Sequence, residues 1–177
     1  VAMTAFVAAL ASPASAQAPA IEASGAYAYL ADPSINMPAG WLADAAFRVS
    51  ETTSVVAEIN HSRKAVKTLG VPFTLSVTTY QGGVRVTGRA SRVAVFGQAL
   101  GGFGRFGGRL SAGSVDLGLT LNAVTLQFGG GAIVPVGSRF GVRAGLDYRY
   151  AVMLSSDLPL EARQWRVTTG MVLAVGR

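Results

Sequence analysis

The sequence predicts an all-β fold, an eight-stranded antiparallel up-and-down transmembrane barrel preceded by an N-terminal signal peptide. Residues 140–150 carry apolar or aromatic side chains at even positions and glycine, arginine or aspartate at odd positions, as in a strand with two unlike faces. Mean hydropathy is +0.41 and only 14% of residues are charged, yet no apolar run beyond residue 18 is long enough for a spanning helix. Apolar residues at alternate positions are typical of a barrel with a lipid-facing exterior and a polar interior.

The N-terminus is predicted to be a signal peptide over residues 1–16, with the barrel domain at 17–177. Residues 1–11 are almost entirely apolar, and Ala14-Ser15-Ala16 fits a small-x-small cleavage site before Gln17. Export agrees with the absence of cysteine in a fold that relies on no disulfide.

The charge balance does not indicate nucleic-acid binding. The net charge is +6 and the isoelectric point about 10.3, but most basic residues are arginines dispersed through alternating segments of an exported chain. We therefore expect no nucleic-acid partner.

The first four strands are predicted at residues 25–30, 40–49, 54–62 and 78–89 from their alternation. A loop signal at Asp32-Pro33 separates the first two, a polar turn at 50–53 the next two, and a longer loop at 63–73 the last two. The apolar faces consist of Tyr27 and Tyr29; Trp41, Ala43, Ala45, Phe47 and Val49; Val55, Ala57 and Ile59; and Tyr80, Val84 and Val86.

The last four strands are predicted at residues 93–103, within 116–134, at 140–150 and at 164–175. Tight turns at 90–92 and 135–138 alternate with longer connections at 104–114, which is glycine-rich, and at 151–161. Segments of nine to twelve residues suit tilted strands that cross a bilayer. Alternating short and long connections place both termini on the periplasmic side and the longer loops outside.

The polar faces predict a charged lumen. Because an eight-stranded barrel has a bore just wide enough for side chains to fill, we expect these charges to pair with one another and with Gln81, Gln127 and threonine hydroxyls as a structural plug. A gate or selectivity filter is the alternative. The predicted lumen charge network is Asp44, Arg48, Glu58, Arg85, Arg143, Asp147, Arg149 and Arg166.

Two sets of residues are predicted on the outside. Aromatic residues should form the membrane-interface girdle and lipid face: Tyr27, Tyr29, Trp41, Phe47, Tyr80, Tyr148, Tyr150 and Trp165. Five cations are predicted in the external loops: Arg63, Lys64, Lys67, Arg105 and Arg109. One interpretation is that they belong to solvated loops; the alternative hypothesis is that they contact lipopolysaccharide phosphates, which arginine and lysine bind well.

Catalysis is not expected. The single histidine, His61, stands beside Ser62, but adjacent strand residues point to opposite faces and cannot share a proton there. The Gly101-Gly102 and 129–131 glycine runs lack the lysine and serine or threonine of a phosphate loop. We expect no cofactor and no metal.

The chain resembles the small eight-stranded outer-membrane barrels of the OmpA/OmpX type. The resemblance covers about residues 24–177 and rests on residues 25–30 (GAYAYL), 96–102 (FGQALGG), the 129–131 glycines before 134–136 (VPV), and 142–150 (VRAGLDYRY). It implies the outer membrane of a Gram-negative bacterium. It also implies that the last strand presents the signal for the barrel-insertion machinery, through Thr168, Gly170, Leu173 and Val175.

The predicted function is therefore that of a monomeric structural or adhesive outer-membrane barrel with a packed polar lumen. Two alternatives remain open from the sequence. One is a small nonselective, porin-like pore. The other is a soluble periplasmic lipocalin-like carrier, whose apolar face would point inward.

Overall fold

Eight antiparallel strands close into one barrel, in which each strand pairs with its sequence neighbours and the last returns to the first. The computed structural model describes residues 21–32, 36–68, 71–112, 115–154 and 161–175. The predicted fold class is confirmed, while the predicted signal peptide lies outside the described residues. The strands are β1 (Ile21–Ala31), β2 (Ala39–Arg48), β3 (Thr53–Thr68), β4 (Val71–Ala90), β5 (Val93–Ala112), β6 (Val115–Pro135), β7 (Phe140–Met153) and β8 (Glu161–Val175).

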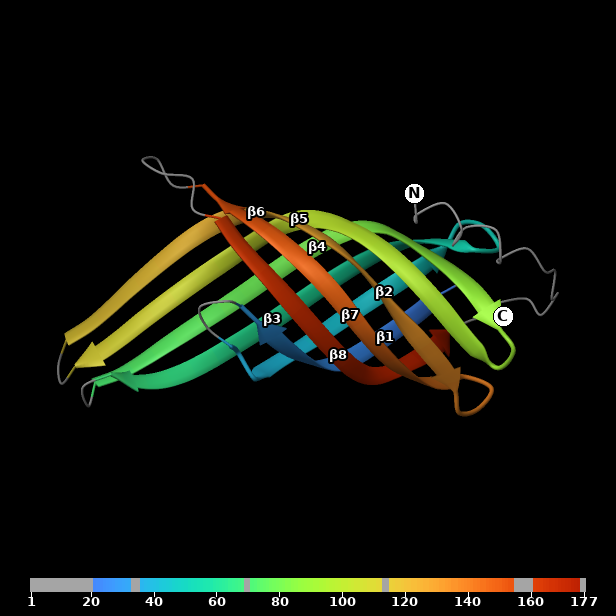
Figure 1. Ribbon diagram of the computed structural model, residues 1–177, viewed down its shortest axis with the longest axis horizontal. Helices are drawn as coiled ribbons and strands as arrows, with labels where there is room; N and C mark the ends of the chain where they lie inside the picture. Colours follow the sequence, from blue (N-terminus) through green and yellow to red (C-terminus); the bar gives the residue numbers. More distant parts are fainter. Residues whose placement is uncertain (1–20, 33–35, 69–70, 113–114, 155–160, 176–177) are drawn as a thin grey trace, which may run out of the picture.

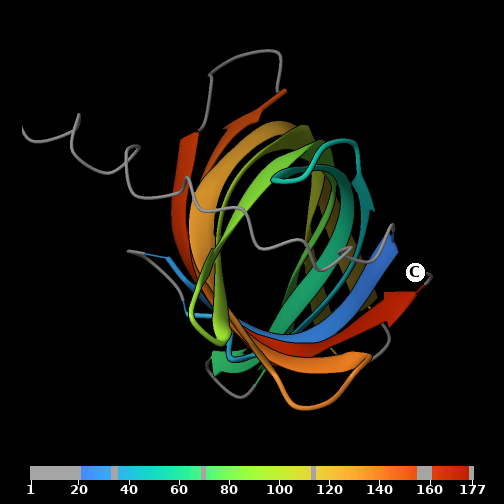
Figure 2. The same ribbon diagram turned by 90° about the vertical axis from the view of Figure 1, so that its right-hand side faces the viewer.

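The strands run steeply tilted around the barrel axis, and β3–β6 project beyond the ends of β1 and β2 at one end (Figure 1). The β2–β3, β4–β5 and β6–β7 connections lie together at the opposite end, where β1 begins and β8 ends. The view turned by 90° shows the ring of strands that surrounds the lumen (Figure 2). No helix among the described residues is long and apolar enough to cross a membrane.

The barrel is polar inside and apolar outside along most of its length. Arginine, glutamine and acidic side chains are buried, whereas large apolar side chains such as Phe128, Leu126 and Trp165 are about half exposed, at 55%, 48% and 51%. A water-soluble barrel would bury these residues, because exposure of so much apolar area to water is unfavourable. A hydrocarbon environment removes that penalty, and closure leaves no strand edge with unpaired amides.

Two predicted loops are wrong. Residues 63–73 and 104–114 were expected to be loops because of Gly70, Pro72 and the glycine-rich composition of the second segment. In the structure β3 continues to Thr68 and β5 to Ala112. Their pairing is continuous, with Val66 opposite Phe73 and Leu110 opposite Leu117. Ladder hydrogen bonds therefore outweigh the local turn preferences here.

The reason lies in a reversal of the side-chain pattern partway along β3–β6. His61, Thr78, Arg105 and Asn122 are adjacent in register across these four strands, and we call them the boundary row. Below this row, which means toward the short turns, the outward residues are apolar, as at Tyr80, Phe103 and Val124. Above it, toward the β3–β4 and β5–β6 connections, the outward residues become polar and the inward residues become apolar.

We call the part of β3–β6 that includes and lies beyond the boundary row the extended wall. Its outward residues include Arg63, Ser76, Gly107 and Thr120, which form one register row. Its inward residues include Val77, Phe106 and Leu121, on the same side of the strands as the lumen. The boundary row therefore marks the level at which the sheet leaves the hydrocarbon.

Candidate functional site

The half of the lumen nearer the short turns is organised around Asp44 of β2. Arg85 of β4 donates from Nη2 to Asp44 Oδ2 at 3.1 Å, and Nη1 of Arg143 on β7 hydrogen bonds to the same oxygen. The Phe96 ring lies against both guanidinium groups, with its centroid 4.5 Å from Cζ of Arg143 and 5.0 Å from Cζ of Arg85. One carboxylate thus holds two arginines that share cation–π contacts with one ring.

A second cluster occupies the middle of the lumen and is centred on Arg166 of β8. Arg166 reaches across the barrel to Glu58 of β3, with Nη1–Oε1 and Nη2–Oε2 distances of 2.6 and 3.0 Å. It also donates from Nη2 and Nε to Asp147 Oδ2 of β7, at 2.7 and 3.2 Å. The two-pronged geometry is the strong form of the arginine–carboxylate interaction, and it ties opposite walls of the barrel together.

Amide side chains connect the clusters into one network. Gln98 accepts from Arg85 Nη2 at 2.9 Å and donates to Asp147 Oδ1 at 3.0 Å. Gln127 donates to Glu58 at 3.4 Å and accepts from Arg149 Nη2 at 3.0 Å. The polar chain therefore continues without a break from the Asp44 cluster to Arg149.

Arg149 differs from the other buried arginines because its contacts among the described residues are to amides. Besides Gln127, its Nη1 and Nη2 atoms lie 3.4 Å from Asn60 Oδ1. Asn60 in turn donates to the Trp41 carbonyl at 2.8 Å. The guanidinium group of Arg149 is thus hydrogen bonded to neutral amide oxygens, next to the Glu58 cluster.

Seven of the eight residues predicted for the network lie in this interior, and Arg48 does not join them. The arginines at 85, 143, 149 and 166 are at most 2% exposed. Arg48 lies at the end of β2, with a side chain 19% exposed. It pairs with Glu22 at 3.6 Å and donates to the Glu51 carbonyl at 2.6 Å. The sequence predicted that Arg48 lies on the inner face of β2, but its position at the end of the strand keeps it out of the packed lumen.

The predicted network did not include Gln98, Asn60, Phe96 and Ser24, although each touches a member of it. Their inward position follows from alternation, so parity along the strand was the available signal. Their partners were not predictable, since they come from strands that are distant in sequence. Gly131 has a related role, because a Cβ there would lie 2.8 Å from Phe96 Cζ.

The predicted aromatic residues all lie on the outer face. Tyr27, Trp41, Phe47, Tyr80 and Trp165 are exposed, and the other three are half-buried. Tyr148 of β7 packs edge-on against Trp165 of β8 with ring centroids 5.0 Å apart. The Tyr27 hydroxyl donates to the Pro38 carbonyl, which links the outer face to the β1–β2 connection.

The five predicted lipopolysaccharide-contacting cations lie on strands, not on loops. Arg63 and Lys67 are exposed on the outer face of β3, and Arg105 and Arg109 on the outer face of β5. Lys64 is different, because its position on β3 faces inward. The extended wall thus carries four outward cations beyond the apolar belt, and we call them the cationic rim.

The chemistry-bearing residues do not assemble into a catalytic or metal site in the described part of the chain. His61 faces outward, with Nδ1 2.9 Å from Thr78 Oγ1, whereas the neighbouring Ser62 is buried inside. No group of three or more histidine, cysteine, aspartate or glutamate side chains there could hold a metal.

The residues of the predicted insertion signal divide between the two faces of β8. Thr168 is buried in the lumen, and Leu173 and Val175 are exposed outside. A Cβ at Gly170 would overlap Ala26 of β1. Glycine at this position therefore also permits the close β1–β8 pairing that closes the barrel.

Solved structures share this arrangement. Neisserial surface protein A superposes with a TM-score of 0.63 at 14% identity, covering 88% of this chain and 96% of that one. Ail, the attachment invasion locus protein of Yersinia pestis, gives 0.54 at 14%, with 86% and 96% covered. The N-terminal β-barrel domain of Pseudomonas aeruginosa OprF gives 0.50 at 8%, with 86% and 96% covered.

The chain has the fold of the small outer-membrane β-barrels. The resemblance inferred from the sequence is confirmed at this level. No family model matches the sequence, and no curated protein matches it. The fold and the exposed apolar belt together assign the chain to the bacterial outer membrane, and the soluble carrier with an apolar bore is wrong for the body of the barrel.

Proposed function

We propose that this protein is a structural and adhesive component of the outer membrane, and that its cationic rim contacts the phosphate groups of lipopolysaccharide. The observation that carries the proposal is the placement of Arg63, Lys67, Arg105 and Arg109. These side chains face outward just beyond the apolar belt. Lipid head groups occupy this level, on the outside of the barrel.

The geometry of the rim favours anion binding. β4 separates the two cationic strands and carries no charged residue at this level, so the backbones of β3 and β5 lie on the order of 10 Å apart there. Ser76 of β4 is the register partner of Arg63, and Thr74 is the register partner of Arg109, so both add hydroxyl donors beside the cations. Arginine binds phosphate oxygens through two parallel hydrogen bonds, and several such contacts would anchor the barrel in a lipopolysaccharide leaflet.

The adhesive part of the proposal has support from a relative of the same fold. Ail is named as an attachment invasion locus protein, and one of its structures, with a TM-score of 0.54 and 16% identity, contains the heparin analogue sucrose octasulfate. A polyanion is a suitable partner for an exposed cluster of arginine and lysine side chains. We extend this chemistry to the cationic rim.

The test reverses the charge of the rim. The fourfold variant Arg63→Glu, Lys67→Glu, Arg105→Glu and Arg109→Glu should lose most of the lipopolysaccharide that co-purifies with the wild-type barrel, because four attractive contacts become repulsive. The measurement is the phosphate content of the purified protein, normalised to folded barrel. If the variant retains as much lipopolysaccharide as wild type, the proposed contact between the cationic rim and lipopolysaccharide is wrong.

Two controls separate the rim from net charge. Reversal of Arg89, Arg92 and Arg139, which are exposed near the short turns at the opposite end, should leave retention unchanged. Lys64→Glu should also leave it unchanged, since this side chain faces inward. Equal losses in the controls would show that only total charge matters.

We also propose that the insertion machinery recognises β8 through Thr168, Gly170, Leu173 and Val175 before the barrel closes. Both edges of β8 are paired in the closed barrel, so recognition must precede pairing with β1. Leu173→Asp with Val175→Asp should reduce the amount of heat-modifiable barrel in the outer membrane. Trp165→Asp, a matched change nearer the other end of β8, should spare the recognition step while it destabilises the inserted barrel.

A further inference from the structure

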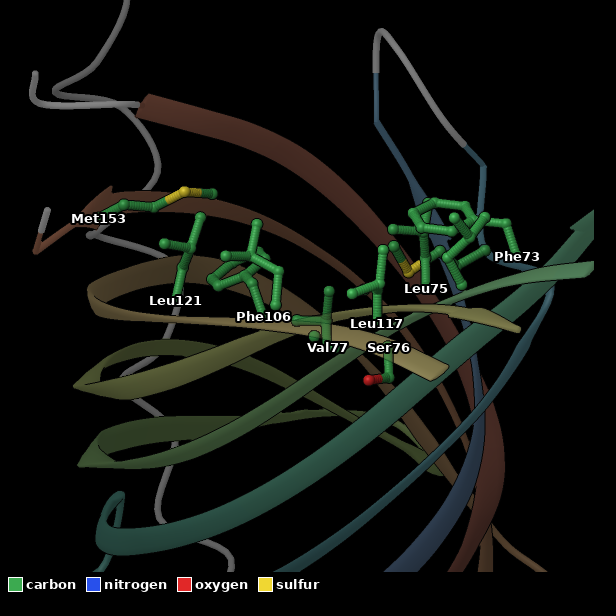
Figure 3. Close-up of a pocket in the computed structure, with 14 residues that line it drawn as sticks. Phe73, Leu75, Ser76, Val77, Phe106, Leu117, Leu121 and Met153 are labelled. Atoms are coloured by element: carbon green, nitrogen blue, oxygen red, sulfur yellow. The ribbon is translucent and has the colours of Figure 1, made fainter. Parts of the chain in front are cut away.

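The inner side of the extended wall carries an apolar pocket that the structural and adhesive role does not use. Its volume is about 440 Å³, within the range of small-molecule sites, about 300–1,000 Å³. Apolar side chains from β4, β5 and β6 face it, joined by Met37 and Met153. Figure 3 shows Leu75, Val77, Phe106 and Leu121 on one side of the sheet, whereas the Ser76 hydroxyl points the other way.

This apolar surface is not part of the lipid-facing belt. Leu117 and Leu119 of β6 are 61% and 64% exposed, and they lie on the same side of the strand as Ala123, which is buried in the barrel. The adjacent outward residue Thr120 belongs to the polar face. The hydrocarbon that covers the outer belt therefore does not cover these leucines, and no described residue covers them either.

The pocket has a closed floor. Leu30, Met37 and Val77 form a buried cluster, against which Leu75 and Phe106 pack. Below it lies the charged network of Arg149 and its neighbours. A ligand that enters from the extracellular side can bury apolar groups in the pocket but meets side chains that fill the lumen. This arrangement suits a binding site better than the entrance of a channel.

One charge stands beside the pocket. Lys64 on β3 is the register partner of Leu75, and both positions face inward. Among the described inward residues of the extended wall, Lys64 is the only charged one. Its flexible stem allows the ammonium group to stay hydrated at the mouth while the stem packs on apolar neighbours. A ligand with an apolar chain and one anionic end matches this arrangement.

We propose that the pocket binds an alkyl carboxylate, a fatty-acid anion taken up from the extracellular medium. Its chain lies against Leu75, Phe106 and Leu119, and its carboxylate lies at Lys64. The two methionines are suited to adapt to chains of different length, because their thioether side chains are flexible and polarisable. This site is independent of the cationic rim, which is on the opposite face of the same strands.

The test uses the barrel in lipid nanodiscs with 11-(dansylamino)undecanoate as the probe. We expect saturable, blue-shifted dansyl emission above that of empty nanodiscs, displaced by dodecanoate and not by butanoate. Leu119→Glu should weaken probe binding about tenfold or more, equivalent to at least 1.4 kcal/mol. Thr120→Glu, the next residue on the outer face, should leave binding unchanged.

A separate measurement tests whether the ligand carboxylate lies at Lys64. Lys64→Gln should weaken displacement by dodecanoate up to about fivefold, as for an exposed ion pair, with no change for dodecanol. Heat-modifiable migration confirms that each variant is folded, and Leu119→Gln replaces Leu119→Glu if the glutamate variant fails to fold. Signal equal to empty nanodiscs, or equal losses at positions 119 and 120, would overturn the site. Equal effects of Lys64→Gln on acid and alcohol would overturn the role of the lysine.

Discussion

At the scale of single residues, the lumen shows how buried arginines are tolerated in a narrow bore. Removing an arginine from water is costly unless carboxylate or amide acceptors replace the lost hydrogen bonds. Arg166 has two carboxylates, and Arg85 and Arg143 share one. Arg149 has amides. The side chains therefore depend on one another, and removal of one leaves charges without partners.

This dependence predicts a large effect of Arg166→Met. The substitution leaves Glu58 and Asp147 buried without their main cation, and the loss of one partner from a buried pair costs about 3–5 kcal/mol. We expect the free energy of unfolding, measured by urea titration of the barrel in lipid vesicles, to fall by about this amount. Arg48→Met, at the end of β2, should lower the free energy of unfolding by less than about 1 kcal/mol.

A second substitution checks that the loss comes from the unpaired carboxylates. Adding Glu58→Gln to Arg166→Met removes one of the two stranded charges, so the double variant should be more stable than the sum of the single effects predicts. Strict additivity would show that packing volume, not charge pairing, sets the stability of the lumen.

Strand parity explains which parts of this network were predictable. Alternation alone assigned Asp44, Glu58 and Asp147 to the inner face, because side-chain direction follows from a period of two. It could not show that Arg48 stands at the end of its strand, since this depends on where the ladder stops. Nor could it pair Arg166 with Glu58, because that contact forms across the closed barrel.

At the scale of elements, β3–β5 show why these parts of the extended wall were not recognised as strand. A single pattern, apolar outside and polar inside, was applied to the whole chain. Above the boundary row the pattern is inverted, as at Leu75 and Thr74 or Leu119 and Thr120. A sheet that leaves the membrane changes solvent on its outer face, so the same strand carries two opposite patterns.

The boundary row predicts where lipid contact ends on β6. Because the chain has no cysteine, single cysteines at Val124, Thr120 and Leu119 can be spin-labelled without background. The Val124→Cys label should be relaxed mainly by oxygen, which concentrates in lipid. The Thr120→Cys and Leu119→Cys labels should be relaxed mainly by a water-soluble nickel complex. A lipid-like ratio at position 120 would place the extended wall in the membrane.

The β4–β5 turn provides an element-scale prediction about stability. Ala90 and Val93 pair across a two-residue connection, in which Ser91 has a φ of 59°. A residue other than glycine costs roughly 1–2 kcal/mol in this left-handed region. Ser91→Gly should therefore be neutral or stabilising by up to about 1 kcal/mol in urea titration, and Ser91→Val destabilising. A destabilising glycine would show that the serine hydroxyl contributes more than the strain costs.

At the scale of the whole molecule, the number of strands and the closure follow from physics that the sequence displays. An apolar exterior in hydrocarbon permits no open sheet edge, and eight alternating segments then define a bore of side-chain width. Residues such as Arg85 of β4 and Asp44 of β2 meet only because the sheet closes. The clusters of the lumen, the cationic rim and the pocket of the extended wall are properties of the closed barrel, although the membrane-spanning part of each strand was recognisable by itself.

The same closure predicts that the barrel does not conduct ions. The network crosses the lumen from Asp44 to Arg149 with four long guanidinium side chains, so planar-bilayer recordings of wild type should show no discrete steps. Arg149→Ala combined with Arg166→Ala removes two of the side chains that fill the lumen. The double variant should show small cation-selective conductance steps, because Glu58 and Asp147 remain. Steps of equal size in wild type and variant would mean that ions pass the network, and the pore alternative would then replace the plug.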